Sequence, residues 1–117
     1  MLIVEDNALA SGALRVLFEQ TGHRVGVAAT AAEAVGMVAR DTPDLMLLDL
    51  TLPDGDGFGV LQRLRAGGCF PRVVVALTGH DEPALAERCA DLGCRDMLLK
   101  PVPTRELLRR ASEWLAE

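Results

Sequence analysis

Four places along the chain carry side chains whose chemistry suits metal ions and phosphate. The acid pair Glu5-Asp6, the carboxylate of Asp49, the hydroxyl of Thr78 and the ammonium of Lys100 each follow a short apolar run. Clustered carboxylates repel one another unless a cation joins them, and Mg²⁺ prefers such oxygen ligands together with phosphate oxygens. A carboxylate such as Asp49 can also accept a phosphoryl group as a nucleophile. If the fold brings these residues together, the sequence predicts a metal-dependent phosphoryl site.

Lys100 stands out by composition, because it is the single lysine among twelve basic residues. A lysine ammonium is a compact point charge, whereas an arginine guanidinium is a planar fork. A lysine at the end of an apolar run therefore suits contact with phosphoryl oxygens beside a metal. Taken alone, the occurrence of one lysine could equally be due to chance in a chain that prefers arginine.

The hydropathy pattern predicts a parallel sheet flanked by helices, because short apolar runs alternate with helix-length segments along the chain. Most of the runs are almost continuously apolar, as in strands covered on both faces, while the second alternates as an edge strand does. The predicted strands are Leu2 to Glu5, Arg24 to Ala28, Leu45 to Leu48, Val73 to Leu77 and Met97 to Leu99. The predicted helices are Ala8 to Gln20, Ala31 to Arg40, Phe58 to Ala66, Glu82 to Leu92 and Arg105 to Ala116.

Two of the predicted helices begin with local capping signals. Thr30 and Glu33 have the spacing of a capping box. Asp81 precedes Glu82-Pro83, which predicts Asp81 as the N-cap with proline in the first turn.

In an open sheet of this kind, ligands bind outside the carboxyl ends of the strands. The acid pair, Asp49, Thr78 and Lys100 all lie within about a residue of a predicted strand end, so we expect them to meet at one edge. The segment from Thr51 to Gly59, TLPDGDGFG, adds a proline and three glycines. Such a segment predicts a tight loop whose backbone approaches a metal or a phosphate.

Length and charge narrow the class of protein. A chain of 117 residues fits one domain, 1–117, that can bury a core. Its longest apolar run, Val73 to Leu77, is far short of the roughly 20 residues of a membrane span. A net charge of −5 argues against nucleic acid as a partner of this domain itself. The first residues do not resemble a secretory signal, so a cytoplasmic location is expected, with the cysteines as reduced structural thiols.

Each feature has a simpler structural explanation when it is taken alone. An acid pair after a strand often supplies the negative charge at a helix N-terminus. Asp49 could be a turn residue, and Thr78-Gly79 an ordinary strand exit. Their arrangement on successive strand ends favours one shared site over these separate explanations.

The segments LIVEDN, LMLLDLTLPDGDG, ALTG and MLLKP together resemble the receiver domain of two-component response regulators, over essentially all 117 residues. The resemblance implies a flavodoxin-like doubly wound (βα)5 fold of the α/β class. Its parallel sheet would have five strands in the order 2-1-3-4-5, with helices on both faces. It further implies that Asp49 is the phosphoacceptor, and that Thr78 and Lys100 contact the phosphoryl group.

The same resemblance implies the ligands of a divalent cation, Mg²⁺ or Mn²⁺. Asp6 and Asp49 would bind the ion directly, and Glu5 mostly through water. The backbone carbonyl of Thr51 would be a further ligand.

The chain departs from the family pattern on its last predicted strand. Met97 occupies the position that usually holds the aromatic partner of Thr78 in the signalling step, and the chain has no tyrosine. Methionine is flexible and can fill the vacated space, so we expect the signal to travel mainly through the loop after Thr78 and the helix that follows. Thr51 and His80 lie where family members vary and where side chains can screen the acyl phosphate from water. For His80, a solvated loop position without a role is the favoured interpretation, and modulation is the alternative.

The resemblance therefore implies a phosphorylation-controlled switch rather than an enzyme, with self-phosphorylation from small donors and autodephosphorylation. The implied partners are a histidine kinase or phosphotransfer protein and a downstream output, and dimerisation could use the face of the fourth and fifth helices. A Mg²⁺-dependent aspartyl-phosphate hydrolase is one alternative, although such enzymes have an aspartate where this chain has Thr51. A receiver-like docking module is another. The chain could be a stand-alone receiver, the receiver of a hybrid kinase or a fragment of a longer regulator, and the near absence of residues before the first strand favours a trimmed chain.

Overall fold

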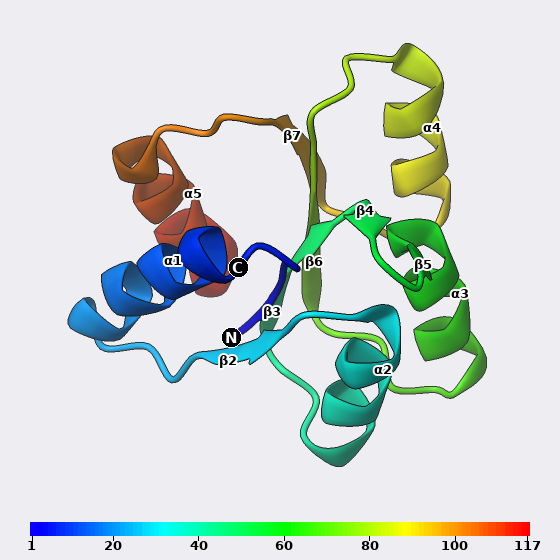
Figure 1. Cartoon of the computed structure of the whole chain (residues 1–117), viewed down its shortest axis with the longest axis horizontal. Helices are drawn as coiled ribbons and strands as arrows, with labels where there is room; N and C mark the ends of the chain where they lie inside the picture. Colours follow the sequence, from blue (N-terminus) through cyan, green and yellow to red (C-terminus); the bar gives the residue numbers. More distant parts are fainter.

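The computed structural model describes residues 1–117 and has three layers, a central sheet between two layers of helices (Figure 1). The sheet has the order β2-β1-β3-β6-β7, and all neighbouring strands are parallel. Because β6 and β7 are its fourth and fifth strands in sequence, this is the predicted order, with β2 at an edge as expected. The strands are β1 (Leu2–Val4), β2 (Gly26–Ala28), β3 (Leu45–Asp49), β6 (Val73–Thr78) and β7 (Asp96–Leu99).

The helices cover the two faces of the sheet unequally. They are α1 (Ala8–Gln20), α2 (Ala31–Arg40), α3 (Gly57–Ala66), α4 (Pro83–Asp91) and α5 (Thr104–Ala116). Residues of α1 and α5 pack on one face, whereas α2, α3 and α4 contribute to the cluster on the other face. None of the helices combines the length and the apolar character that a membrane span requires.

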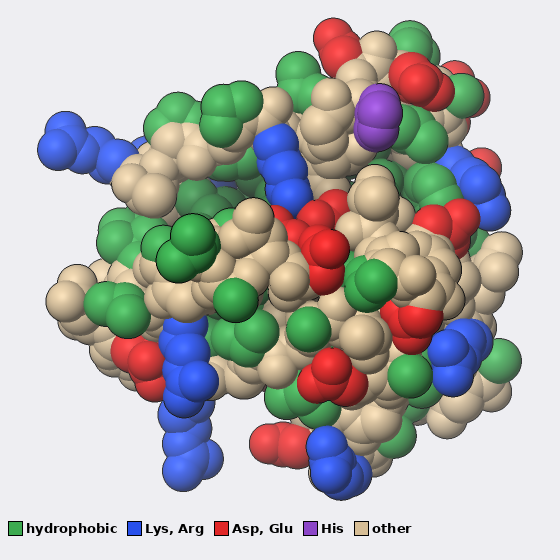
Figure 2. All heavy atoms as spheres, in the orientation of Figure 1, with side chains coloured by type: hydrophobic (Ala, Val, Ile, Leu, Met, Phe, Trp, Pro, Cys, Tyr) green, Lys and Arg blue, Asp and Glu red, His purple; other side chains and the backbone are tan.

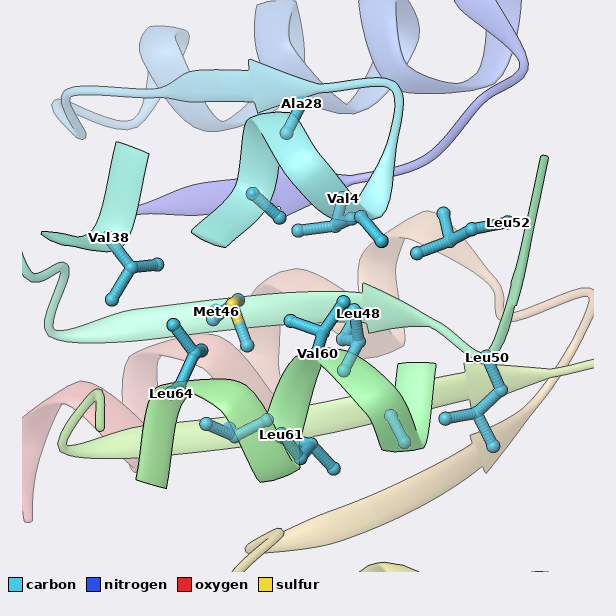
Figure 3. Packing of buried hydrophobic residues seen from close by; sticks show 14 of the residues in the cluster. Val4, Ala28, Val38, Met46, Leu48, Leu50, Leu52, Val60, Leu61 and Leu64 are labelled. Carbon is cyan, nitrogen blue, oxygen red and sulfur yellow. The ribbon is translucent and has the colours of Figure 1, made fainter. Parts of the chain in front are cut away.

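Strand β3 lies at the centre of both cores. Met46 and Leu48 pack toward α2 and α3 (Figure 3). Leu45 and Leu47 pack toward α1 and α5 on the other face. Alternate side chains of a strand point to opposite faces, so a strand covered on both faces has to be apolar along its whole buried length. Asp49 at its last position is therefore the first place where this strand can present a charge.

The segment after Asp49 is more ordered than the predicted loop. Thr51–Leu52 (β4) and Gly55–Asp56 (β5) pair as a short antiparallel hairpin. Asp56 then caps α3, since its Oδ1 accepts the Gly59 N–H at 2.9 Å. This hairpin lies outside the main sheet and accounts for the two extra strand numbers.

The two capping signals had different outcomes. Thr30 caps α2 as predicted, with its Oγ1 accepting the Glu33 N–H at 3.1 Å. The prediction of Asp81 as a cap is wrong, because α4 begins at Pro83 and its N-cap is Glu82, which makes no side-chain capping bond. A proline restricts the residue before it to extended backbone, and that places the helix boundary at Glu82. The beginning of α4 is consequently held less firmly than that of α2.

All three cysteines are free thiols, in agreement with the expectation of structural thiols. They belong to or pack against the cluster under α2, α3 and α4. Burial, followed by the neighbouring Cys89, raises the pKa of Cys94 to about 12. Because the thiolate is the reactive form, this cysteine is chemically inert near neutral pH.

Candidate functional site

The predicted polar residues meet at the carboxyl edge of the main sheet. Glu5 follows β1, and Asp49 ends β3. Thr78 ends β6, and Lys100 follows β7. Asp6 is exposed, whereas Glu5, Asp49 and Thr78 are buried, with 9%, 6% and 2% of their surfaces exposed. Near the middle of one face of the molecule, Figure 2 shows acidic side chains gathered beside a basic one.

Lys100 joins two of the carboxylates. Its Nζ lies 2.9 Å from Glu5 Oε1 and 2.8 Å from Asp49 Oδ2. Its backbone N–H donates to the Thr78 carbonyl at 2.7 Å, which fixes the start of the segment after β7 against the end of β6. Burial by itself would lower the pKa of Lys100. The contacts with Asp49 and Glu5 outweigh burial, so the pKa of Lys100 lies above its usual value. The ammonium therefore stays charged in the site.

Asp49 is held through both of its carboxylate oxygens. Oδ2 faces Lys100, and Oδ1 accepts the Thr51 N–H at 2.9 Å. Burial opposes ionisation of Asp49, but Glu5, Lys100 and the Thr51 N–H outweigh it, so the pKa of Asp49 lies below its usual value. The pKa of Glu5 is raised, first by burial and then by Asp49. Of the two buried carboxyls, Asp49 is the one that keeps its charge most firmly, as a nucleophile must.

The acidic side chains fit a hard divalent cation. Glu5, Asp6 and Asp49 each offer an oxygen, and these oxygens all lie within 4.8 Å of one another. Lys100 neutralises one of the three negative charges, so the cluster retains an excess that favours a cation. A Mg²⁺ ion binds one or two carboxylates directly and keeps several waters. Such an ion suits three carboxylate oxygens at this spacing, because not all of them have to bind it directly. Thr51 begins β4, shortly after Asp49, and its carbonyl remains the predicted further ligand.

Thr78 and the residues around it are placed differently from the acidic cluster. The hydroxyl of Thr78 accepts the His80 N–H at 3.1 Å and is thus turned toward its own loop. The side chain of His80 is exposed. Met97 is partly buried and packs against the cluster under α2, α3 and α4, in register with Ala76 of β6. The structure therefore brings Glu5 and Asp49 into contact with Lys100 and places Asp6 beside them, while Thr78 joins Lys100 through its carbonyl.

Two residues at the site had no signal in the sequence beyond a turn. Asp54, between β4 and β5, accepts the Ala31 N–H at 2.7 Å and the Ala32 N–H at 3.1 Å. At Gly57, a Cβ would lie 3.0 Å from the Asp49 carbonyl oxygen, closer than ordinary contact. The Pro-Asp-Gly sequence around position 54 predicts a turn, but no local pattern tells which distant helix that turn meets.

Open space adjoins the reactive groups. A cavity of about 380 Å³ lies between α1 and the segment that leads into α5, and Glu5, Asp49 and Lys100 are among its lining residues. Its remaining lining is mostly apolar, with Leu14, Leu77 and Leu107 among the residues that form it. Glu5, Asp49 and Lys100 thus border open space on the side of α1 and α5.

Comparison with known proteins gives a consistent result. The family model described as "Response regulator receiver domain" matches residues 1–112. "Response regulator MprA" of Mycobacterium leprae is 38% identical over 112 residues, which cover 94% of this chain and 48% of that protein. A "Protein-glutamate methylesterase/protein-glutamine glutaminase 5" of Myxococcus xanthus is 36% identical over 121 residues, or 100% of this chain and 35% of that protein.

Solved structures resemble the chain over almost its whole length. A CheY-like response regulator receiver domain protein from Methanospirillum hungatei superposes with a TM-score of 0.89 at 27% identity, covering 98% of this chain and 91% of that one. By contrast, the chain spans less than half the length of the two curated relatives. The activities of those whole proteins thus do not carry over from the match.

Proposed function

Because the chain belongs to the response regulator receiver domain family, we propose that it is a phosphorylation-dependent switch whose phosphoacceptor is Asp49. The observation that carries this proposal is the pairing of Lys100 Nζ with Asp49 Oδ2 at 2.8 Å, on a buried carboxylate. An ionised carboxylate beside a fixed ammonium has both the nucleophile and the charge that phosphoryl transfer needs.

Asp49 would carry out the transfer as a nucleophile. One of its carboxylate oxygens attacks the phosphorus atom while the bond from phosphorus to the donor breaks. That bond is P–N in a phosphohistidine and P–O in an acyl phosphate, and the departing imidazole or carboxylate keeps the electron pair. Lys100 then moves from the carboxylate oxygen to the phosphoryl oxygens over a short distance.

The acidic cluster supplies the second source of positive charge by binding a divalent ion. Asp6 and Asp49, with Glu5 through water and the Thr51 carbonyl, would hold Mg²⁺ or Mn²⁺. When bound, the ion neutralises charge on the phosphoryl oxygens and orients the donor. Without it, the three carboxylates would repel an anionic donor, so we expect no transfer in the presence of a chelator.

The switch would begin at Thr78. Its hydroxyl accepts the His80 N–H at 3.1 Å, so a phosphoryl group that draws this hydroxyl away leaves that N–H without its acceptor. The loop from Gly79 to Glu82 would then rearrange, and it leads directly into α4. Helix α4 starts without a side-chain cap and has one fully buried residue, Cys89, which makes it the least firmly held helix near the site.

The face formed by α4, β7 and α5 is the natural output surface of such a switch. Leu99 on β7 lies beside Thr78 in register and is 47% exposed, which is unusual for a leucine of this sheet. A partner or a second copy of the chain that covers this face would sense the movement of α4.

The phosphoryl donor would be a histidine kinase or a phosphotransfer protein, and a cytoplasmic location follows from such partners. Thr51 and His80 have exposed side chains that can set the lifetime of the acyl phosphate.

Replacing Met97 with alanine should leave the rate of phosphorylation within about twofold of wild type, while lowering the free energy of unfolding by about 1–2 kcal/mol. Met97 is partly buried against the α4 side of the core, whereas the reactive Asp49 is held by Lys100. The measurement is the rate of phosphorylation by acetyl phosphate, with urea unfolding for stability. A large loss of phosphorylation would show that Met97 shapes the reactive site.

One experiment separates the proposed switch from its alternatives. The protein is incubated with Mg²⁺ and acetyl phosphate, and separately with a phosphomonoester, and product is followed over time. A single phosphoryl group on each chain supports the switch. Rapid multiple turnover of the phosphomonoester favours the hydrolase, although Thr51 stands where that class needs a second aspartate. No adduct and no structural response to beryllofluoride would favour a docking module.

A further inference from the structure

The turn between β4 and β5 is tied to a helix that is distant in the sequence. Asp54 accepts the N–H groups of Ala31 and Ala32 at 2.7 and 3.1 Å, one with each carboxylate oxygen. These N–H groups belong to the first turn of α2 and have no partner within the helix. They hold the pKa of Asp54 below its usual value, so the carboxylate keeps its charge although it is exposed.

This contact is more than an ordinary helix cap. Helix α2 already has a cap of its own, because Thr30 Oγ1 accepts the Glu33 N–H. Asp54 accepts the other N–H groups of the first turn, those of Ala31 and Ala32, although it lies 23 and 22 residues further along the chain. The helix is itself anchored by the buried side chains of Ala31, Ala34 and Val38. The contact thus fixes the tip of the hairpin against a firmly packed element.

The hairpin in turn holds the reactive carboxylate. Its first residue, Thr51, donates its N–H to Asp49 Oδ1 at 2.9 Å. At its base, the Gly57 N–H donates to the Leu50 carbonyl at 3.0 Å. On its inner side, Leu52 is buried in the core. A shift of the hairpin tip would therefore move Thr51 and loosen its bond to Asp49.

We infer that Asp54 is a positioning residue for phosphorylation, because its contact with α2 holds Thr51 and the Asp49 carboxylate in the geometry that binds the metal ion and the donor. The inference rests on the proposed function of Asp49. Asp54 acts through the hairpin and does not itself touch the reacting atoms. Removing a residue that orients a metal ligand without itself binding the metal typically changes the metal affinity by roughly 10- to 100-fold.

The matched variants are Asp54→Ala and Thr30→Ala. Both remove a cap from the N-terminus of α2, so both should lower the melting temperature by a similar amount. We expect Asp54→Ala to weaken Mg²⁺ binding by roughly tenfold, and Thr30→Ala to leave it nearly unchanged. Asp54→Asn keeps one acceptor oxygen and should lie between wild type and Asp54→Ala. Mg²⁺ affinity is measured by calorimetry, and the Mg²⁺ dependence of phosphorylation by acetyl phosphate gives a second readout.

The possible results are distinct. Hydrogen exchange at residues 50–57 should rise in Asp54→Ala and stay as in wild type in Thr30→Ala. If both variants lose Mg²⁺ affinity equally, Asp54 is a helix cap and the inference is overturned. If wild type takes up no phosphoryl group, the proposed function fails, while the calorimetric comparison still decides whether Asp54 positions the acidic cluster.

Discussion

Exchanging Lys100 for arginine is expected to leave Asp49 able to accept a phosphoryl group while reducing the conformational response by roughly tenfold. The Lys100 ammonium contacts Glu5 and Asp49 at 2.9 and 2.8 Å, and its side chain is only 34% exposed. A longer, planar guanidinium preserves the charge but cannot occupy the same point between two carboxylates. With the side chain displaced, the hydrogen bond from the residue 100 N–H to the Thr78 carbonyl would no longer couple the end of β6 to the position of the phosphoryl group.

The measurement compares two quantities in the same sample. Intact mass gives the fraction of phosphorylated chains, and hydrogen exchange over residues 78–91 gives the response of the loop and α4. Arg105→Lys is the matched control, since Arg105 is an exposed basic residue of α5 and undergoes the reverse exchange. If Lys100→Arg responds as wild type does, the response does not require a lysine at this position, and its choice over arginine is a chance of composition.

A methyl group added at Gly57 should lower the free energy of unfolding by about 1–3 kcal/mol, the usual cost of overpacking. It would lie 2.8 Å from Leu50 Cδ2, 3.0 Å from the Leu50 Cα and 3.0 Å from the Asp49 carbonyl oxygen. The leucine side chain can turn aside, but the two backbone atoms cannot move without shifting Asp49. We therefore expect Gly57→Ala also to slow phosphorylation by at least tenfold, as a misplaced nucleophile does.

Gly59 provides the control for this prediction within the same helix. The Cβ of an alanine at position 59 would meet Asp56 Oδ1 at 3.6 Å, an ordinary contact. Gly59→Ala should thus be neutral or stabilising by up to about 1 kcal/mol, because glycine is a poor helix former. Urea unfolding and phosphorylation kinetics test both variants. Equal effects at the two glycines would contradict the close approach of α3 to Asp49.

The sequence predicts the sheet and its polar edge because both depend on local, repeated patterns. Strand β3 had to be apolar up to Asp49, since both of its faces are covered. Once the strands are parallel, the residues at their carboxyl ends necessarily meet. Glu5, Asp49, Thr78 and Lys100 could therefore be grouped before any distance was known.

One feature that the sequence did not predict depends on a contact between distant segments. The bond from Asp54 to the first turn of α2 links residues more than twenty positions apart, and a turn motif does not specify its partner. The boundary of α4 was misplaced for a different reason. Asp81 is a favourable capping residue, but Pro83 fixes the backbone of Glu82 and thereby the first helical residue.

The most direct measurement of the central claim is the intact mass of the protein after incubation with Mg²⁺ and acetyl phosphate, for wild type, Asp49→Asn and the control Asp91→Asn. Asp91 is an exposed aspartate at the end of α4, away from the site. We predict one phosphoryl adduct on wild type and on Asp91→Asn, lost when Mg²⁺ is chelated, and none on Asp49→Asn. An adduct that persists in Asp49→Asn, or its absence from wild type, would contradict the assignment of Asp49 as the phosphoacceptor.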